Sequence, residues 1–155
     1  MIGTKTITVA ACVALAVAAP AGAQDISADP TYETVRLDAG FEDDPYLVEL
    51  QAGGSMDASD LGGACTGLIA DAPDVRLIYS SGSLPLILGN VSESDTTIVV
   101  NGPDGRWYCD DDGGEGVDPL LVFDEPQSGQ YDIWVGTYAD ADLADSVMFI
   151  TEIID

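Results

Sequence analysis

The sequence predicts an all-β fold: an antiparallel, jelly-roll-like β-sandwich of about 8–10 strands with one disulfide. Runs rich in Val, Ile, Leu, Tyr, Phe and Trp recur at intervals of roughly 8 to 14 residues, between clusters of Gly, Pro, Asp and Ser. Helical signals are weak, because residues 139–146 are too few for a stable helix and residues 55–63 have room for one helical turn. Two cysteines in the predicted domain supply the disulfide.

Turn chemistry and alternation place the strands in order. Residues 101–105, Asn-Gly-Pro-Asp-Gly, predict a tight hairpin turn, and a Ser-Gly pair at 128–129 predicts another turn. Within residues 131–135 the alternation points Tyr131, Ile133 and Val135 toward the core and Trp134 the other way. The predicted strands are residues 33–38, 46–51, 65–69, 75–80, 84–91, 96–101, 107–110, 120–124, 131–138 and 147–153.

The N-terminus has the pattern of a secretory signal peptide. A single cation, Lys5, precedes an apolar run of about 13 residues, shorter than the roughly 20 that span a bilayer. Small residues at 21–23, Ala-Gly-Ala, form the cleavage site. We therefore expect residues 1–23 to be removed, residues 24–31 to be a flexible lead-in, and residues 32–155 to form a single domain in the periplasm or outside the cell.

Composition excludes several functions. The chain has no His, so neither a Ser-His-Asp triad nor an imidazole metal site can form. Its 28 Asp and Glu against 4 Lys and Arg give a net charge of −24, which repels nucleic acid. Removal of Lys5 leaves no lysine for Schiff-base chemistry. We expect a protein that is not an enzyme; a hydrolase using two of the many carboxylates is the minor alternative.

Cysteine usage agrees with export. Cys12 lies in the predicted signal peptide, which leaves Cys65 and Cys109 as a pair in the mature chain. In an oxidising compartment such a pair normally forms a disulfide. Two free thiols are the alternative, but the sequence offers no base to activate a catalytic cysteine.

Five segments carry a resemblance to a known family. They are residues 65–69 (CTGLI), 73–77 (PDVRL), 95–105 (DTTIVVNGPDG), 107–112 (WYCDDD) and 126–138 (PQSGQYDIWVGTY). Their order and spacing resemble small exported proteins of Gram-negative bacteria that are similar to the bacterial pre-peptidase C-terminal domain, over about residues 38–152. The resemblance implies a β-sandwich with an accessory role, similar to carbohydrate-binding or matrix-binding modules, and some relatives bind calcium. A peptidase-type name, which such proteins sometimes carry, is no sign of activity here.

An acidic loop is the candidate metal site. Residues 110–118 hold five carboxylates and three glycines, and Ca²⁺ prefers carboxylate and carbonyl oxygens. The EF-hand register is missing, and a solvated acidic turn is the alternative. The candidate ligands are Asp110, Asp111, Asp112, Glu115 and Asp118.

Two tryptophans are the candidate ligand-binding residues, because sugar-binding sandwiches present flat aromatic faces. Trp134 is the better candidate, since alternation points it away from the core. Trp107 and Tyr108 are neighbours in a predicted strand, so they point to opposite faces. Core packing is the alternative for each of them.

Together these features predict a non-catalytic, exported binding or accessory module that recognises a polysaccharide or a protein and is stabilised by Ca²⁺. A structural or stress-related acidic envelope protein is the alternative. We expect neither nucleic-acid binding nor a membrane span in the mature chain.

Overall fold

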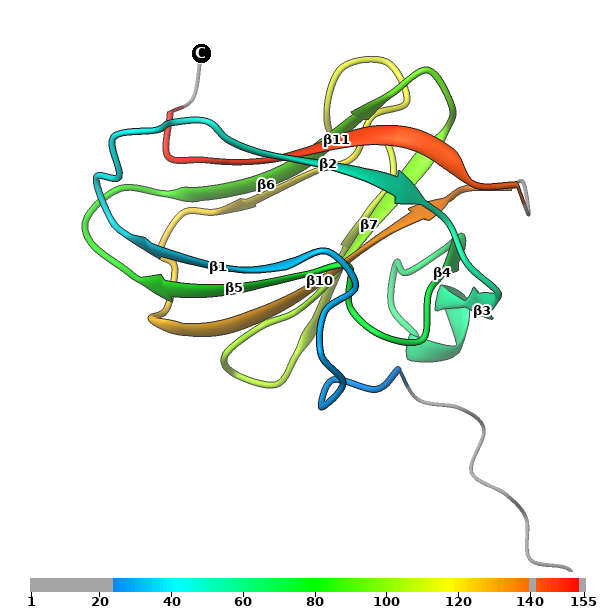
Figure 1. The fold of residues 1–155 in the computed structure, drawn as a ribbon, viewed down its shortest axis with the longest axis horizontal. Helices are drawn as coiled ribbons and strands as arrows, with labels where there is room; N and C mark the ends of the chain where they lie inside the picture. The colour runs from blue at the N-terminus through cyan, green and yellow to red at the C-terminus, as the bar shows by residue number, and fades with distance from the viewer. Residues whose placement is uncertain (1–23, 140–141, 154–155) are drawn as a thin grey trace, which may run out of the picture.

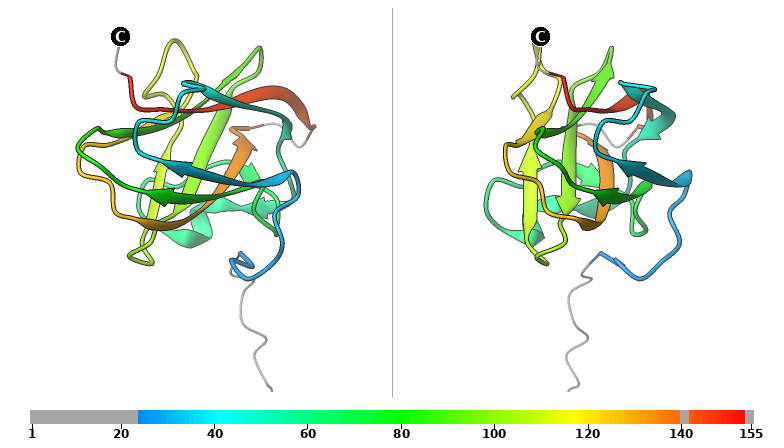
Figure 2. Two further views of the ribbon diagram at one scale, coloured as in Figure 1. Left: turned by 60° about the vertical axis from the view of Figure 1, so that its left-hand side comes forward. Right: turned by 90° about the vertical axis from the view of Figure 1, so that its left-hand side faces the viewer.

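The computed structural model describes residues 24–139 and 142–153, and these form a sandwich of two β-sheets (Figures 1 and 2). The predicted signal peptide lies outside the described residues. No described segment forms a helix of the length and apolarity that a bilayer crossing requires. The elements are β1 Glu33–Asp38, β2 Tyr46–Ala52, β3 Met56–Asp57, the 3₁₀ helix η1 Ala58–Leu61, β4 Leu68–Ile69, β5 Val75–Ser80, β6 Leu86–Ser92, β7 Thr96–Asn101, β8 Trp107–Asp110, β9 Leu120–Phe123, β10 Gly129–Thr137 and β11 Ala144–Thr151.

The large sheet is built around β10. The first half of β10 pairs with β5, its second half pairs with β7, and Thr137 at its end pairs with Leu68 of β4. β1 extends the sheet beyond β5, β8 extends it beyond β7, and β3 pairs with β4.

The small sheet has the order β2-β11-β6-β9 and is antiparallel throughout. β11 pairs with β2 on one side and with β6 on the other, so the last strand of the chain is central in this sheet, as β10 is in the other.

The all-β prediction is confirmed, with one difference in pairing. β1 and β5 run parallel, with Glu33 opposite Val75, whereas the sequence predicted an antiparallel sandwich. A parallel pair needs a long connection, and the chain supplies it by passing through β2 in the other sheet. The expected helical turn in residues 55–63 is present as η1. The two-residue strand β3 was not predicted, and β4 covers only the last two residues of the strand predicted at residues 65–69.

The main core fills the space between the sheets. Tyr131, Ile133 and Val135 of β10 lie in it with almost no exposed surface, as alternation predicted. They face Leu88 of β6 and Met148 of β11 in the same buried cluster. This burial supplies the main driving force for joining the layers.

The N-terminal segment is hydrogen-bonded to the large sheet, whereas its composition predicted a flexible lead-in. Arg76 pairs with Asp132 at 2.6 Å, and its Nη2 donates to the carbonyls of Ile26 and Ala28, each at 2.9 Å. The backbone N–H of Thr31 donates to a carbonyl of the loop before β5 at 2.8 Å. The Arg76 guanidinium, which has several N–H donors, thus holds the polar N-terminal segment against the large sheet.

Asp74 makes the stability of the fold depend on pH. It is 2% exposed, its Oδ2 accepts the N–H of Val135 at 2.8 Å, and burial raises its pKa from 3.8 to about 7. The folded state therefore binds more protons than the unfolded state between these pH values. The stability contributed by the neutral carboxyl is fully present below about pH 4 and is lost as the pH rises through about 7.

We expect Asp74→Asn to be more stable than the wild type by about 1–3 kcal/mol at about pH 8, because the amide keeps an acceptor and carries no charge. Urea unfolding at a series of pH values measures this. Asp71→Asn, at an exposed position nearby, is the control and should follow the wild-type curve. If the free energy of unfolding changed with pH in the same way for Asp74→Asn and the wild type, Asp74 would not be the source of the pH dependence.

Candidate functional site

Trp134 does not form a ligand-binding surface. It points away from the main core, as predicted, but its exposed fraction is 0%, so the prediction of an exposed ring is wrong. The physical reason is that residues 56–70, which include β3, η1 and β4, pack over this face of the large sheet. We call this segment the cover. Ala58, Cys65 and Ile69 from that segment contact Trp134 in a second buried cluster.

The predicted disulfide is present and fastens this cover. Cys65 and Cys109 are bonded with their Cα atoms 4.9 Å apart, which joins the cover to β8. Trp107 of β8 is half-buried, and its ring centroid lies 5.4 Å from that of Trp134. Tyr108 points to the opposite face, as expected, where it contacts Phe123. Both tryptophans therefore pack beneath or beside the cover.

The carboxylates at the two ends of the acidic loop organise its backbone. Asp110 Oδ2 accepts the N–H groups of Gly113 at 2.6 Å and Leu120 at 2.9 Å. Asp118 Oδ1 accepts the N–H of Ser92 at 3.2 Å, which ties the loop to the end of β6. Asp110 and Asp118 therefore have a structural role in the loop that requires no bound ion.

The middle of the loop brings like charges together. The pKa of Asp95 is raised by partial burial and then by the nearby charges of Asp112 and Asp111, and the pKa of Asp111 is raised for similar reasons. Among residues 24–139 and 142–153, no three Asp, Glu or Cys side chains are grouped so as to hold a metal ion. Ca²⁺ binding by the predicted ligands, Asp110, Asp111, Asp112, Glu115 and Asp118, stays a prediction.

The outer face of the small sheet carries an uncovered apolar surface, which we call the open face. One row crosses all four strands in register: Leu47 of β2 pairs with Phe149 of β11, Phe149 with Gly89 of β6, and Gly89 with Leu120 of β9. Gly89 leaves room for the Phe149 ring, because a Cβ there would lie 2.3 Å from Phe149 Cζ. A continuous apolar stripe results.

Neighbouring rows widen the stripe. Val147 of β11 pairs with Val91 of β6 on one side, and Val122 of β9 pairs with Ile87 on the other. Leu47 is 57% exposed, Val91 is 53% exposed and Val122 is 44% exposed. The three side chains lie on the same outer face but on different strands and in different rows, with Phe149 and Val147 between them. Contiguous exposed apolar surface is a common feature of contact surfaces.

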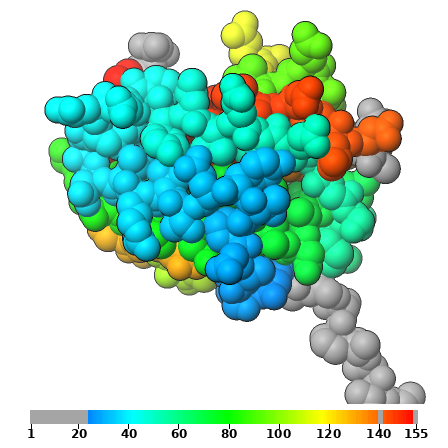
Figure 3. All heavy atoms as spheres, in the orientation of Figure 1, coloured from blue at the N-terminus to red at the C-terminus, as the bar shows by residue number. Residues whose placement is uncertain are grey.

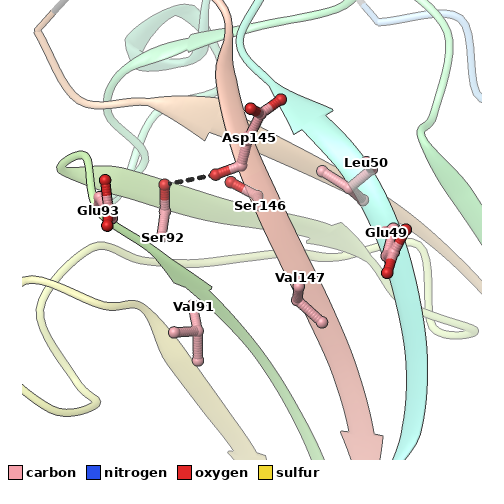
Figure 4. A pocket seen from close by; sticks show the side chains of 8 residues that line it. All are labelled: Glu49, Leu50, Val91, Ser92, Glu93, Asp145, Ser146 and Val147. Carbon is pink, nitrogen blue, oxygen red and sulfur yellow. Dashed lines mark hydrogen bonds between the residues drawn. The ribbon is translucent and has the colours of Figure 1, made fainter.

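Two hollows lie at one end of the open face. One, of about 440 Å³, is lined by Val91, Val147 and acidic residues of β2 and β11 (Figure 4). The other, of about 630 Å³, lies between Phe149, Leu120 and the acidic loop at Gly113. The surface is thus shaped as well as apolar.

The sequence held a weak signal for the open face. β6 begins Leu-Ile-Leu and β9 reads Leu-Leu-Val-Phe, with apolar residues at successive positions, so both of their faces are apolar. A strand buried on both faces has the same pattern, and periodicity cannot separate the two cases. Sequence reasoning therefore missed Leu47, Val91 and Val122 and singled out the tryptophans.

No protein-family model matches the chain, and no curated protein matches it. Among solved structures, the chain is similar to the pre-peptidase C-terminal domain of a collagenase from Bacillus anthracis, with a TM-score of 0.46 and 12% identity over 80% of this chain and 100% of that one. It is also similar to PliG of Aeromonas hydrophila, a periplasmic inhibitor of g-type lysozyme, with a TM-score of 0.42 and 11% identity over 77% of this chain and 96% of that one. Both similarities concern only the general course of the fold.

Proposed function

We propose that this protein is an exported, non-catalytic module that binds another protein through the open face. The observation that carries the proposal is the set of half-exposed aliphatic side chains on the outer face of the small sheet, Leu47, Val91 and Val122. Exposed apolar surface of this kind is removed from water when a partner docks. The Cys65–Cys109 disulfide supports export, because such bonds persist in oxidising compartments.

A protein is favoured over a polysaccharide as the ligand. Sugar-binding surfaces stack sugar rings on exposed flat aromatics. Here Trp134 is buried, Trp107 packs against it, and the open face is mainly aliphatic. Aliphatic and aromatic side chains of a protein partner fit such a surface better than hydroxylated rings do.

The test compares retention of envelope proteins on the immobilised mature chain and on Val91→Asp. We expect Val91→Asp to retain at least about tenfold less protein than the wild-type chain, because a charge buried at the interface would oppose docking. Mass spectrometry identifies the retained proteins. Leu84→Asp is the matched control, since Leu84 is 45% exposed, lies in the β5–β6 loop outside the four strands of the small sheet, and lines neither hollow. Equal retention by all three chains would overturn the proposal.

A further inference from the structure

Acidic side chains border one end of the open face. Glu49 of β2 lies in the same row as Val147 and Val91 and lines one hollow, together with Asp145 of β11 and Glu93 after β6 (Figure 4). Glu115 and Asp118 line the neighbouring hollow from the acidic loop. The apolar stripe is therefore bordered by negative charge at this end.

Two acidic loops rise beside the face. The loop of residues 110–118 and the β6–β7 turn of residues 93–95 protrude above the small sheet, as Figures 1 and 3 show. Their carboxylates are close enough for Asp111 and Asp112 to raise the pKa of Asp95. They form a negatively charged wall at one end of the apolar surface.

This negative charge is not neutralised within the described part of the chain. The described cations are Arg36, Arg76 and Arg106, and none of them lines either hollow. Arg76 pairs with Asp132 and Arg106 pairs with Asp104, and neither of these carboxylates lines a hollow of the open face.

From this we infer that the occupant of the open face is a cationic protein segment, one that presents aliphatic or aromatic side chains flanked by Lys or Arg. This inference rests on the proposed function and adds the chemistry of the partner. Charge complementarity speeds encounter and fixes orientation, while the apolar stripe supplies the buried area. A second copy of this chain is a poor occupant, because each chain carries a net charge of −24 and two copies repel each other.

The experiment is selection from a displayed library of random peptides on the disulfide-bonded mature chain, with counter-selection on Val91→Asp and, separately, on Leu47→Asp. Two variants are used so that a folding defect in one does not decide the result, and the melting temperature of each is checked. We expect the enriched peptides to combine Lys or Arg with large apolar residues and to bind Val91→Asp at least about tenfold more weakly.

The charge is tested with the enriched peptides. Glu49→Gln/Glu93→Gln/Glu115→Gln should weaken binding at least about tenfold at about 0.05 M salt and flatten its salt dependence. Asp29→Asn/Asp38→Asn/Asp60→Asn removes as many charges from exposed positions off the open face, and should weaken binding less than about threefold.

The outcomes separate the two proposals. Peptides that depend on the open face but are neutral or acidic would overturn the cationic partner and leave the binding face standing. Enrichment that is equal on the wild type and both face variants would overturn the binding face itself. A wild-type dimer in sedimentation that Leu47→Asp dissociates would make a second copy the occupant and overturn the cationic partner.

Discussion

Replacing both disulfide cysteines, Cys65→Ser/Cys109→Ser, is expected to lower the free energy of unfolding by about 4 kcal/mol, close to what the chain-entropy model gives for a sequence separation of 44. The bond closes a loop that contains β5, β6 and β7, so its loss raises the conformational entropy of the unfolded chain. Urea unfolding followed by circular dichroism under non-reducing conditions measures the change.

The effect should also be local. Because the bond fastens the cover of residues 56–70 to β8, amide hydrogens of the cover should exchange faster in the double variant than those of β10 and β11. Wild type treated with reductant is the matched control and should behave like the variant. A variant as stable as the oxidised wild type would show that the bond contributes nothing to the fold.

Trp134→Ala is expected to cost about 3–5 kcal/mol of stability, because the side chain is 0% exposed and its removal leaves a cavity beneath the cover. An exposed ligand-binding tryptophan would give almost no change in melting temperature, so this measurement separates the two interpretations directly. Thermal and urea unfolding at neutral pH provide it.

Two control variants test whether the effect comes from the volume of the buried Trp134 side chain. Trp134→Phe keeps a ring in contact with Ile69 and Val99 and should cost less than the alanine variant. Tyr138→Ala, at an adjoining exposed position, should be nearly neutral. A loss below about 1 kcal/mol for Trp134→Ala would contradict the packing described.

The strands were predictable where the local signals are strong. β5, β7 and β8 have the bounds expected from the sequence, because Gly, Pro and Asn punctuate their ends. The parallel pairing of β1 with β5 was not predictable, because partner choice depends on where the whole chain returns.

The candidate site was harder to predict, for a reason that Trp134 makes clear. Alternation tells which of two faces a side chain occupies, but not whether another segment covers that face. The cover over Trp134 comes from residues 56–70, whose short elements have no periodic pattern. On the small sheet the reverse holds: Val91 and Val122 look like core residues, yet no layer covers them in the described structure.

The positions of β10 and β11 set the order in which the fold can assemble. Both central strands come last in the sequence. Pairs such as β1–β5, β7–β8 and β6–β9 can form earlier, but they are joined into the two sheets only once β10 and β11 are available. Contacts this distant in sequence make folding slow and cooperative. A chain that is translocated N-terminus first would thus cross as an open polymer and close into its sandwich only after its C-terminal strands had emerged.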